Sequence, residues 1–479
     1  MLAISLAEKT RFRAGDTIIG WVTRSAHIVD SDVALSIKFL GRTKVKIVIS
    51  RGQSSSTYRS RYIFWNSRNP PVSARLYNGP IHVPPNIEES QSWPFAITIP
   101  TNIPEETIYQ EESDATFLKP GDPETVQLPG SYMFDDDSFW GNSSEAYVDY
   151  HLEAVLQDSK GHRFEARIPI KIDGPSSPIP ITDFGVRSFR GNLQFLNTHR
   201  LNPALADAKL SFGQKAQQVF GSSKVPILAF QITANTPSVL QLDNPNFIPF
   251  QVQGSVMKDR TSEVLRDLHP TLVITRFLLR LTANCKVIAP GTFSSHDENG
   301  ETTWTIIEYL HRGTTRGASS PSPSPSPSEG NVQEDTNVKG EPKAAKVARE
   351  EQATAEPPPD ADTLILPMDS APFPLDLGQA LQLRLPRVLR QRLVTPSFNT
   401  FNIHNSHTLS WELRVEAAGK DTTFYGKHSV NVMPPSEETL PLYNADAEPQ
   451  PYRSNAGQYI RGAGRDGGGH SAAHIAPGA

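Results

Sequence analysis

Hydrophobic positions in the first part of the chain recur with a period of two. Up to about Asp173, apolar side chains alternate with polar ones over short runs. The alternation is clearest near the end, where the residues of one parity are apolar: Phe164, Ala166, Ile168, Ile170 and Ile172. Such alternation is typical of antiparallel strands with one dry and one wet face. Residues 1–173 therefore predict a β-sandwich, with residues 158–161 as the hairpin turn between its last two strands.

Two polar stretches interrupt this pattern, at residues 52–92 and 109–144. We expect both to be long surface loops. Their aromatic residues predict that parts of them pack back onto the sheets: Tyr58, Tyr62, Phe64 and Trp65 in the first, and Phe134, Phe139 and Trp140 in the second.

The strand signal resumes after a proline-broken hinge at residues 174–180. It is strongest at residues 225–233, 247–254, 272–281, 304–309, 380–385 and 408–415. Residues 314–362 contain Ser-Pro repeats and mixed charges but no apolar face, which predicts a disordered insert. The second sandwich is therefore expected over residues 181–432, interrupted by this insert, and residues 433–479 are expected to form a disordered tail.

Composition adds limits to this picture. The chain has 479 residues, 41 prolines and a net charge of −5, so no overall positive field favours nucleic acid. A single cysteine, Cys285, excludes an intramolecular disulfide and fits a reducing compartment. No apolar run reaches the roughly 18 residues of a membrane-spanning helix. These features favour a cytoplasmic protein that reaches membranes only peripherally, through its partners.

Three segments occur in an order that resembles a known family. Residues 12–22 read Phe-Arg-Ala-Gly-Asp-Thr-Ile-Ile-Gly-Trp-Val, residues 93–100 read Trp-Pro-Phe-Ala-Ile-Thr-Ile-Pro, and residues 147–156 read Tyr-Val-Asp-Tyr-His-Leu-Glu-Ala-Val-Leu. Together they resemble the N-domain of the arrestins, in their fungal α-arrestin-like branch. Residues 395–403 resemble late strands of an arrestin C-domain. The resemblance implies an all-β chain of two immunoglobulin-like sandwiches that acts as an adaptor.

The sharpest binding signal is Leu440-Pro441-Leu442-Tyr443, a Leu-Pro-x-Tyr variant of the PY motif. Proline holds its backbone near the polyproline II conformation, and WW domains accept the proline and the tyrosine ring in adjacent aromatic-lined slots. The alternative is a chance match in a proline-rich tail. Related fungal arrestins carry such motifs, so the resemblance implies a WW-domain, HECT-type ubiquitin ligase as a partner.

The insert contains a cluster of serines that each precede a proline, which suits proline-directed kinases: Ser320, Ser322, Ser324 and Ser326. Each phosphate adds nearly two negative charges. A plain extended linker explains the same composition.

Basic residues alternate on two predicted strands: Lys9, Arg11 and Arg13 on the first, and Arg42, Lys44 and Lys46 on the second. If both rows meet on one sheet, they form a surface for the acidic or phosphorylated cytosolic tail of a membrane transporter or receptor, as the resemblance implies. An ordinary solvated face is the competing interpretation. The sequence does not decide whether the rows are adjacent.

Catalytic interpretations find little support. Asp135, Asp136 and Asp137 lack the spacing of calcium ligands, and His404 and His407 lack a nearby third metal ligand. Cys285 lies in an apolar stretch, which favours a core thiol over a nucleophile. No phosphate loop, dinucleotide fingerprint or nucleophile elbow occurs. We therefore expect no enzyme activity, no cofactor and no metal.

The resulting hypothesis is an arrestin-like adaptor that recruits a ubiquitin ligase to membrane cargo for endocytosis. It predicts a cytoplasmic protein recruited to the plasma membrane or endosomes. Two alternatives are a pH-signalling arrestin scaffold and a retromer-like trafficking subunit that recruits no ligase.

Overall fold

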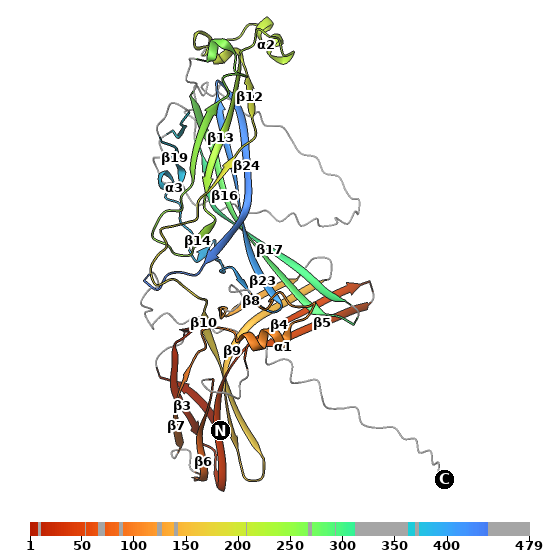
Figure 1. Ribbon diagram of the computed structural model, residues 1–479, viewed down its shortest axis with the longest axis vertical. Helices are drawn as coiled ribbons and strands as arrows, with labels where there is room; N and C mark the ends of the chain where they lie inside the picture. The colour runs from red at the N-terminus through yellow and green to blue at the C-terminus, as the bar shows by residue number, and fades with distance from the viewer. Residues whose placement is uncertain are drawn as a thin grey trace, which may run out of the picture. The chain divides into compact units, whose positions relative to one another are not determined.

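The computed structural model describes residues 1–438, apart from gaps at residues 8–10, 53, 66–71, 86–89, 122–126, 138–141, 207, 267–270, 293, 312–362 and 369–372. Strands dominate these residues, and they form four larger sheets and one two-stranded sheet (Figure 1). The all-β prediction is confirmed. The predicted insert and the Leu-Pro-x-Tyr motif lie outside the described residues.

The first sandwich pairs a three-stranded sheet with a seven-stranded sheet. The smaller sheet contains β1 (Leu2–Leu6), β3 (Thr17–Arg24) and β7 (Gln91–Thr98). The larger sheet contains β2 (Arg11–Arg13), β10 (Arg163–Asp173), β9 (Ser143–Gln157), β4 (Ile28–Arg51) and β5 (Ser54–Ile63) in that order, with β6 (Ser73–Val83) beside β4 and β8 (Tyr132–Asp137) beside β9.

The second sandwich repeats this plan with a five-stranded and a seven-stranded sheet. The smaller sheet contains β11 (Arg187–Arg190), β13 (Ile227–Thr236), β15 (Gln251–Val256) and β19 (Leu375–Asp376), with β12 (Gln194–Asn197) beside β13. The larger sheet contains β14 (Val239–Gln241), β24 (Lys420–Met433), β23 (Ile403–Ala417), β16 (Leu272–Pro290) and β17 (Ser295–Leu310), with β18 (Ile365–Leu366) beside β16 and β22 (Phe398–Asn399) beside β23.

Short elements complete the described chain. The helices are α1 (Glu105–Glu111), α2 (Phe212–Val219) and α3 (Leu377–Ala380), with 3-10 turns η2 (His199–Leu201), η3 (Pro203–Leu205) and η4 (Glu263–Leu265). Strands β20 (Val388–Leu389) and β21 (Arg392–Leu393) form the two-stranded sheet.

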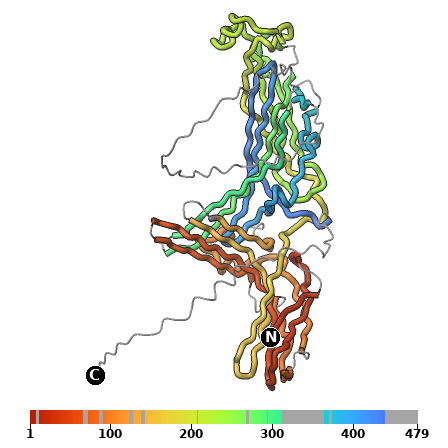
Figure 2. The backbone as a smooth tube through the Cα atoms, turned by 180° about the vertical axis from the view of Figure 1, so that it is seen from behind, coloured from red at the N-terminus to blue at the C-terminus, as the bar shows by residue number. Residues whose placement is uncertain are grey.

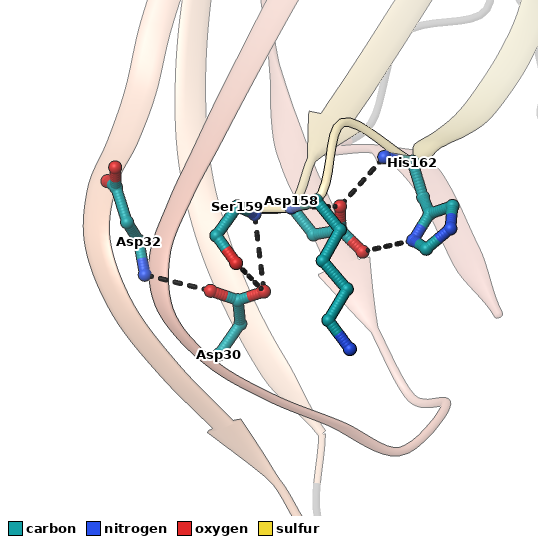
Figure 3. A network of polar contacts seen from close by, with 6 residues as sticks. Asp30, Asp32, Asp158, Ser159 and His162 are labelled. Atoms are coloured by element: carbon teal, nitrogen blue, oxygen red, sulfur yellow. Dashed lines mark hydrogen bonds and ion pairs between the residues drawn. The ribbon is translucent and has the colours of Figure 1, made fainter.

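The alternating pattern forms strands as expected. In β10, all the side chains of the apolar parity are at least half-buried, whereas those of the opposite parity are exposed up to Lys171. The predicted hairpin turn after β9 is confirmed: Asp158 accepts hydrogen bonds from the backbone of Lys160 and His162. Ser159 in the same turn donates its N–H and its hydroxyl to Asp30 of β4 (Figure 3). The turn therefore fixes the register of the long strands at this end of the sheet.

Both predicted surface loops contain strands instead. Residues 52–92 form β5, β6 and the start of β7, and residues 109–144 contain β8. Most of β5 is exposed because it is the edge strand of the seven-stranded sheet, so its composition is polar although its backbone is paired. The aromatic prediction holds for Tyr62, Phe64 and Trp65, which are buried.

The predicted strand at residues 380–385 is also wrong. The Asp376 side chain accepts a hydrogen bond from the N–H of Gln379 and caps α3, which ends at Ala380. Gln382 then adopts a positive φ of 51°, and the chain turns so that Leu383 N–H donates to Gly378 O. Leu381, Leu383 and Leu385 are buried, so their alternation reflects core packing without a strand.

The cores of the two sandwiches meet within one compact unit, Met1–Thr439. Cys285, Phe401 and Ile403 from the second sandwich belong to the core of the first. Polar contacts accompany this packing: Ser60 of β5 donates to the carbonyl of Ile288 at 3.0 Å and accepts from Asn402 Nδ2 at 2.7 Å.

The described chain extends beyond the predicted end of the second sandwich, to residue 438. After β24, Pro434, Pro435 and Ser436 are buried. The N–H of Glu437 donates to the carbonyl of Ser177 at 3.1 Å, within the segment predicted as a hinge. The residues that lead toward the Leu-Pro-x-Tyr motif are therefore held against the folded body as far as Glu437.

Candidate functional site

A concentration of positive charge lies on the polar face of β4 and β5. Residues of even number in β4 point away from the core, which places Arg42, Lys44 and Lys46 in one row. Strand β5 runs antiparallel to β4 and sets Arg61 opposite Lys44 and Arg59 opposite Lys46. Both arginines are exposed. We call these five side chains the basic face.

Carboxylates on the neighbouring strand β9 neutralise part of this charge. Arg42 binds Asp149 in a bidentate manner, with Nε to Oδ1 at 2.6 Å and Nη2 to Oδ2 at 3.0 Å. Lys44 Nζ lies 3.6 Å from Asp149 Oδ2, and Lys46 Nζ lies 2.8 Å from Glu145 Oε1. These pairs hold the β4 side chains in fixed positions on the sheet.

The basic face retains a positive surplus. Its five cations share the surface with Glu145 and Asp149 of β9 and with Asp135, which lies opposite Glu145 on β8. Burial lowers the pKa of Lys44, and the nearby charges of Arg42 and Arg61 lower it further, against the opposing effect of Asp149. Cations that destabilise one another in this way favour a bound anion, which relieves their repulsion.

The same sheet face continues beyond the basic face with a more balanced set of charges. Glu153 of β9 binds Lys38 of β4, with Nζ to Oε1 at 2.6 Å, and also binds Arg167 of β10. Between these groups, burial and then the charge of Arg42 lower the pKa of His151 to about 4. His151 is therefore neutral near pH 7, and the surplus charge is concentrated at β4 and β5.

The other predicted basic row lies elsewhere on this sheet. Strands β10 and β9 separate β2 from β4, so Arg11 and Arg13 do not join the basic face. Arg11 pairs with Asp173, and Arg13 Nη1 lies 2.8 Å from Glu437 Oε1. Lys9 lies outside the described residues. The structure thus brings Arg42, Lys44 and Lys46 together and keeps Arg11 and Arg13 in a separate, ion-paired group.

Two further predicted sites lie outside the described residues: Leu440, Pro441, Leu442 and Tyr443 of the motif, and Ser320, Ser322, Ser324 and Ser326 of the insert. Sequence reasoning missed Arg59 and Arg61, because residues 52–92 were interpreted as a loop. The alternation of Tyr58, Ser60 and Tyr62 with these arginines is a strand signal that identifies them.

The alternative chemical sites have structural explanations. Cys285 is buried, and burial raises the pKa of its thiol to about 11, as befits a core residue. Asp135 and Asp136 lie on strand β8. His404 and His407 lie within strand β23. Across the described ranges, no group of three or more histidine, cysteine or carboxylate side chains is placed to hold a metal ion.

No protein-family model matches the chain, and no curated protein sequence matches it significantly. Within the part of the chain that the structure describes, no helix has the length and apolar character needed to cross a bilayer. The functional proposal therefore rests on the fold and on the basic face.

Proposed function

We propose that this chain is an arrestin-like adaptor that binds an acidic or phosphorylated cytosolic segment of a membrane transporter or receptor. The observation that carries the proposal is the basic face: five cations on two adjacent strands, only partly neutralised, on a chain of two β-sandwiches. The order of the arrestin-like segments in the sequence supports the same assignment.

The basic face suits an extended anionic peptide. Arg59 and Arg61 present exposed guanidinium groups that form bidentate hydrogen bonds with carboxylates or phosphates. Their spacing along β5 follows the period of a strand, which matches alternate side chains of an extended peptide that lies along β5. Lys44 and Lys46 of β4 add positive charge, since they lie opposite Arg61 and Arg59, respectively.

The Leu-Pro-x-Tyr motif supplies the second half of the proposed activity. It recruits a WW-domain ubiquitin ligase of the HECT type to the bound cargo, and the ligase performs the catalysis. Ubiquitinated cargo is then internalised. The adaptor is cytoplasmic under this proposal and is recruited to the plasma membrane or endosomes.

The sharpest test of cargo binding is the double variant Arg59→Glu/Arg61→Glu. Neither arginine is engaged in one of the β9 ion pairs, whereas reversing Arg42 sets a new carboxylate against Asp149 and perturbs the fold. We expect binding to a phosphorylated cytosolic peptide to weaken at least about tenfold at low salt. The difference should shrink near 150 mM salt, where the Debye length is about 8 Å.

The matched control is Arg187→Glu/Arg190→Glu on β11, which makes the same charge change at exposed positions of the second sandwich. Titration calorimetry measures all three proteins against the same peptide. Equal losses of peptide affinity in both double variants would show that net charge alone explains the effect. No loss of affinity in the β5 variant would show that the basic face does not bind cargo.

A further inference from the structure

Helix α2 turns an apolar face toward solvent. The side chains of Phe212, Val219 and Phe220 are 89%, 79% and 85% exposed. Together with Ala216, they occupy positions i, i+4, i+7 and i+8, which form one stripe along a helix. A surface helix ordinarily buries such a stripe against its own protein, whereas α2 turns its apolar stripe toward solvent.

The polar face of α2 is the side that lies against the body. Gln214, Gln217 and Gln218 are half-buried. Gln218 Oε1 accepts a hydrogen bond from Thr198 Oγ1 at 3.3 Å, and Ser211 and Gln214 form a capping box that fixes the start of the helix. The helix is thus attached through its glutamines, and its phenylalanines remain free to contact another apolar phase.

Helix α2 belongs to the segment that joins β12 to β13, beyond the ends of these strands (Figures 1 and 2). The turn that contains η4 lies beside the start of β13, because Ser262 N–H donates to the carbonyl of Ile227 at 2.8 Å. Val264 of this turn is 65% exposed, and Ile227 is 37% exposed. The end of the second sandwich therefore presents further apolar groups near those of α2.

Lysines dominate the charges around α2. Lys209, Lys215 and Lys224 are exposed, and residues 208–227 contain no aspartate or glutamate, although Asp207 precedes them in the sequence. In the neighbouring turn, Asp259 and Glu263 each have an arginine partner, Arg260 at 3.7 Å and Arg266 at 4.0 Å. Exposed phenylalanines flanked by several lysines match the boundary between acyl chains and anionic headgroups.

We propose that α2 is a lipid-contacting element. Phe212, Val219 and Phe220 enter the headgroup and acyl-chain boundary of an anionic bilayer, and Lys209, Lys215 and Lys224 contact lipid phosphates. A second copy of the chain fits this apolar face less well, because its own lysines would lie against Lys209, Lys215 and Lys224 and repel them. The proposal goes beyond the adaptor function, in which partners alone connect the chain to membranes, and it stands independently of the basic face.

The test is co-sedimentation of the full chain with vesicles of phosphatidylcholine, with or without phosphatidylserine. The wild type should bind vesicles that contain phosphatidylserine. Phe212→Ser/Phe220→Ser should lower its partition coefficient at least about tenfold, since two exposed phenylalanines supply most of the apolar area of α2. Lys209→Glu/Lys215→Glu/Lys224→Glu should remove the preference for phosphatidylserine.

Phe373→Ser is the matched control, since it removes a side chain that is 77% exposed and outside α2, and it should bind like the wild type. Because the substituted residues are exposed, we expect each variant to fold, and circular dichroism verifies this. The proposal is wrong if the wild type does not bind the vesicles, or if Phe212→Ser/Phe220→Ser binds as well as the wild type. Self-association of the wild type that Phe212→Ser/Phe220→Ser abolishes, without lipid binding, would assign the face to a second copy.

Discussion

A buried histidine makes the stability of the second sandwich depend on pH. His407 of β23 is 1% exposed, and its Nδ1 lies 2.9 Å from Ser397 Oγ. Burial lowers the pKa of His407 to about 4, against an ordinary value of 6.5. Because the unfolded chain binds this proton more tightly than the folded chain, the stabilisation is complete above pH 6.5 and is lost as the pH falls toward 4.

His407→Gln should therefore flatten the dependence of stability on pH. Between pH 7 and pH 5 the wild type should lose about 2 kcal/mol of its free energy of unfolding through this one group. The variant should lack that part of the slope, while His151 continues to contribute because its pKa is also lowered to about 4. Urea unfolding at a series of pH values measures the effect. His82→Gln, at an exposed position, is the control, and an unchanged slope in His407→Gln would contradict the explanation.

At the scale of elements, the sequence predicts strands well where one face is buried along its length. Strand β10 shows this, because its apolar and polar positions alternate without interruption. The first four residues of the edge strand β5 could not be identified by hydrophobicity, since they are exposed on both faces and only backbone pairing with β4 defines them. The row formed by Arg42, Lys44 and Lys46 was predictable because alternate residues of a strand share one face. The distance between β2 and β4 was not predictable, because it depends on the order of the strands in the sheet.

Strand β4 has one position that tolerates no side chain. At Gly41, an added Cβ would lie 2.5 Å from the Trp65 ring and 2.7 Å from the Tyr150 ring. Both rings stack with Phe39, at centroid distances of 5.4 and 5.9 Å. The glycine therefore permits an aromatic cluster to lie across the longest strand of the first sandwich.

Gly41→Ala should destabilise the protein by about 1–3 kcal/mol, the typical cost of overpacking a filled core. Thermal and urea unfolding measure this loss. Gly213→Ala in α2 is the matched control, because its added methyl group meets no atom within 4 Å and alanine favours helix. A Gly41→Ala protein as stable as the wild type would show that the aromatic cluster rearranges freely.

At the scale of the whole molecule, the sequence and the structure describe different halves of the proposed adaptor. The structure gives two sandwiches and a basic face on β4 and β5. The sequence alone provides the Leu-Pro-x-Tyr motif, three residues beyond Glu437, whose backbone is still bonded to Ser177. The central claim is that one chain joins a cargo surface to a ligase-binding motif.

Tyr443→Ala tests this claim most directly, in a pull-down of the full chain by isolated WW domains of a HECT-type ligase. The tyrosine ring and Pro441 supply most of the apolar area of such a short peptide, so little else compensates for their loss. We expect wild-type protein to bind the WW domains, Tyr443→Ala to abolish this binding, and binding to the phosphorylated cargo peptide to be unchanged. Equal capture of wild type and Tyr443→Ala, or capture of neither, would contradict the account and favour a trafficking subunit that recruits no ligase.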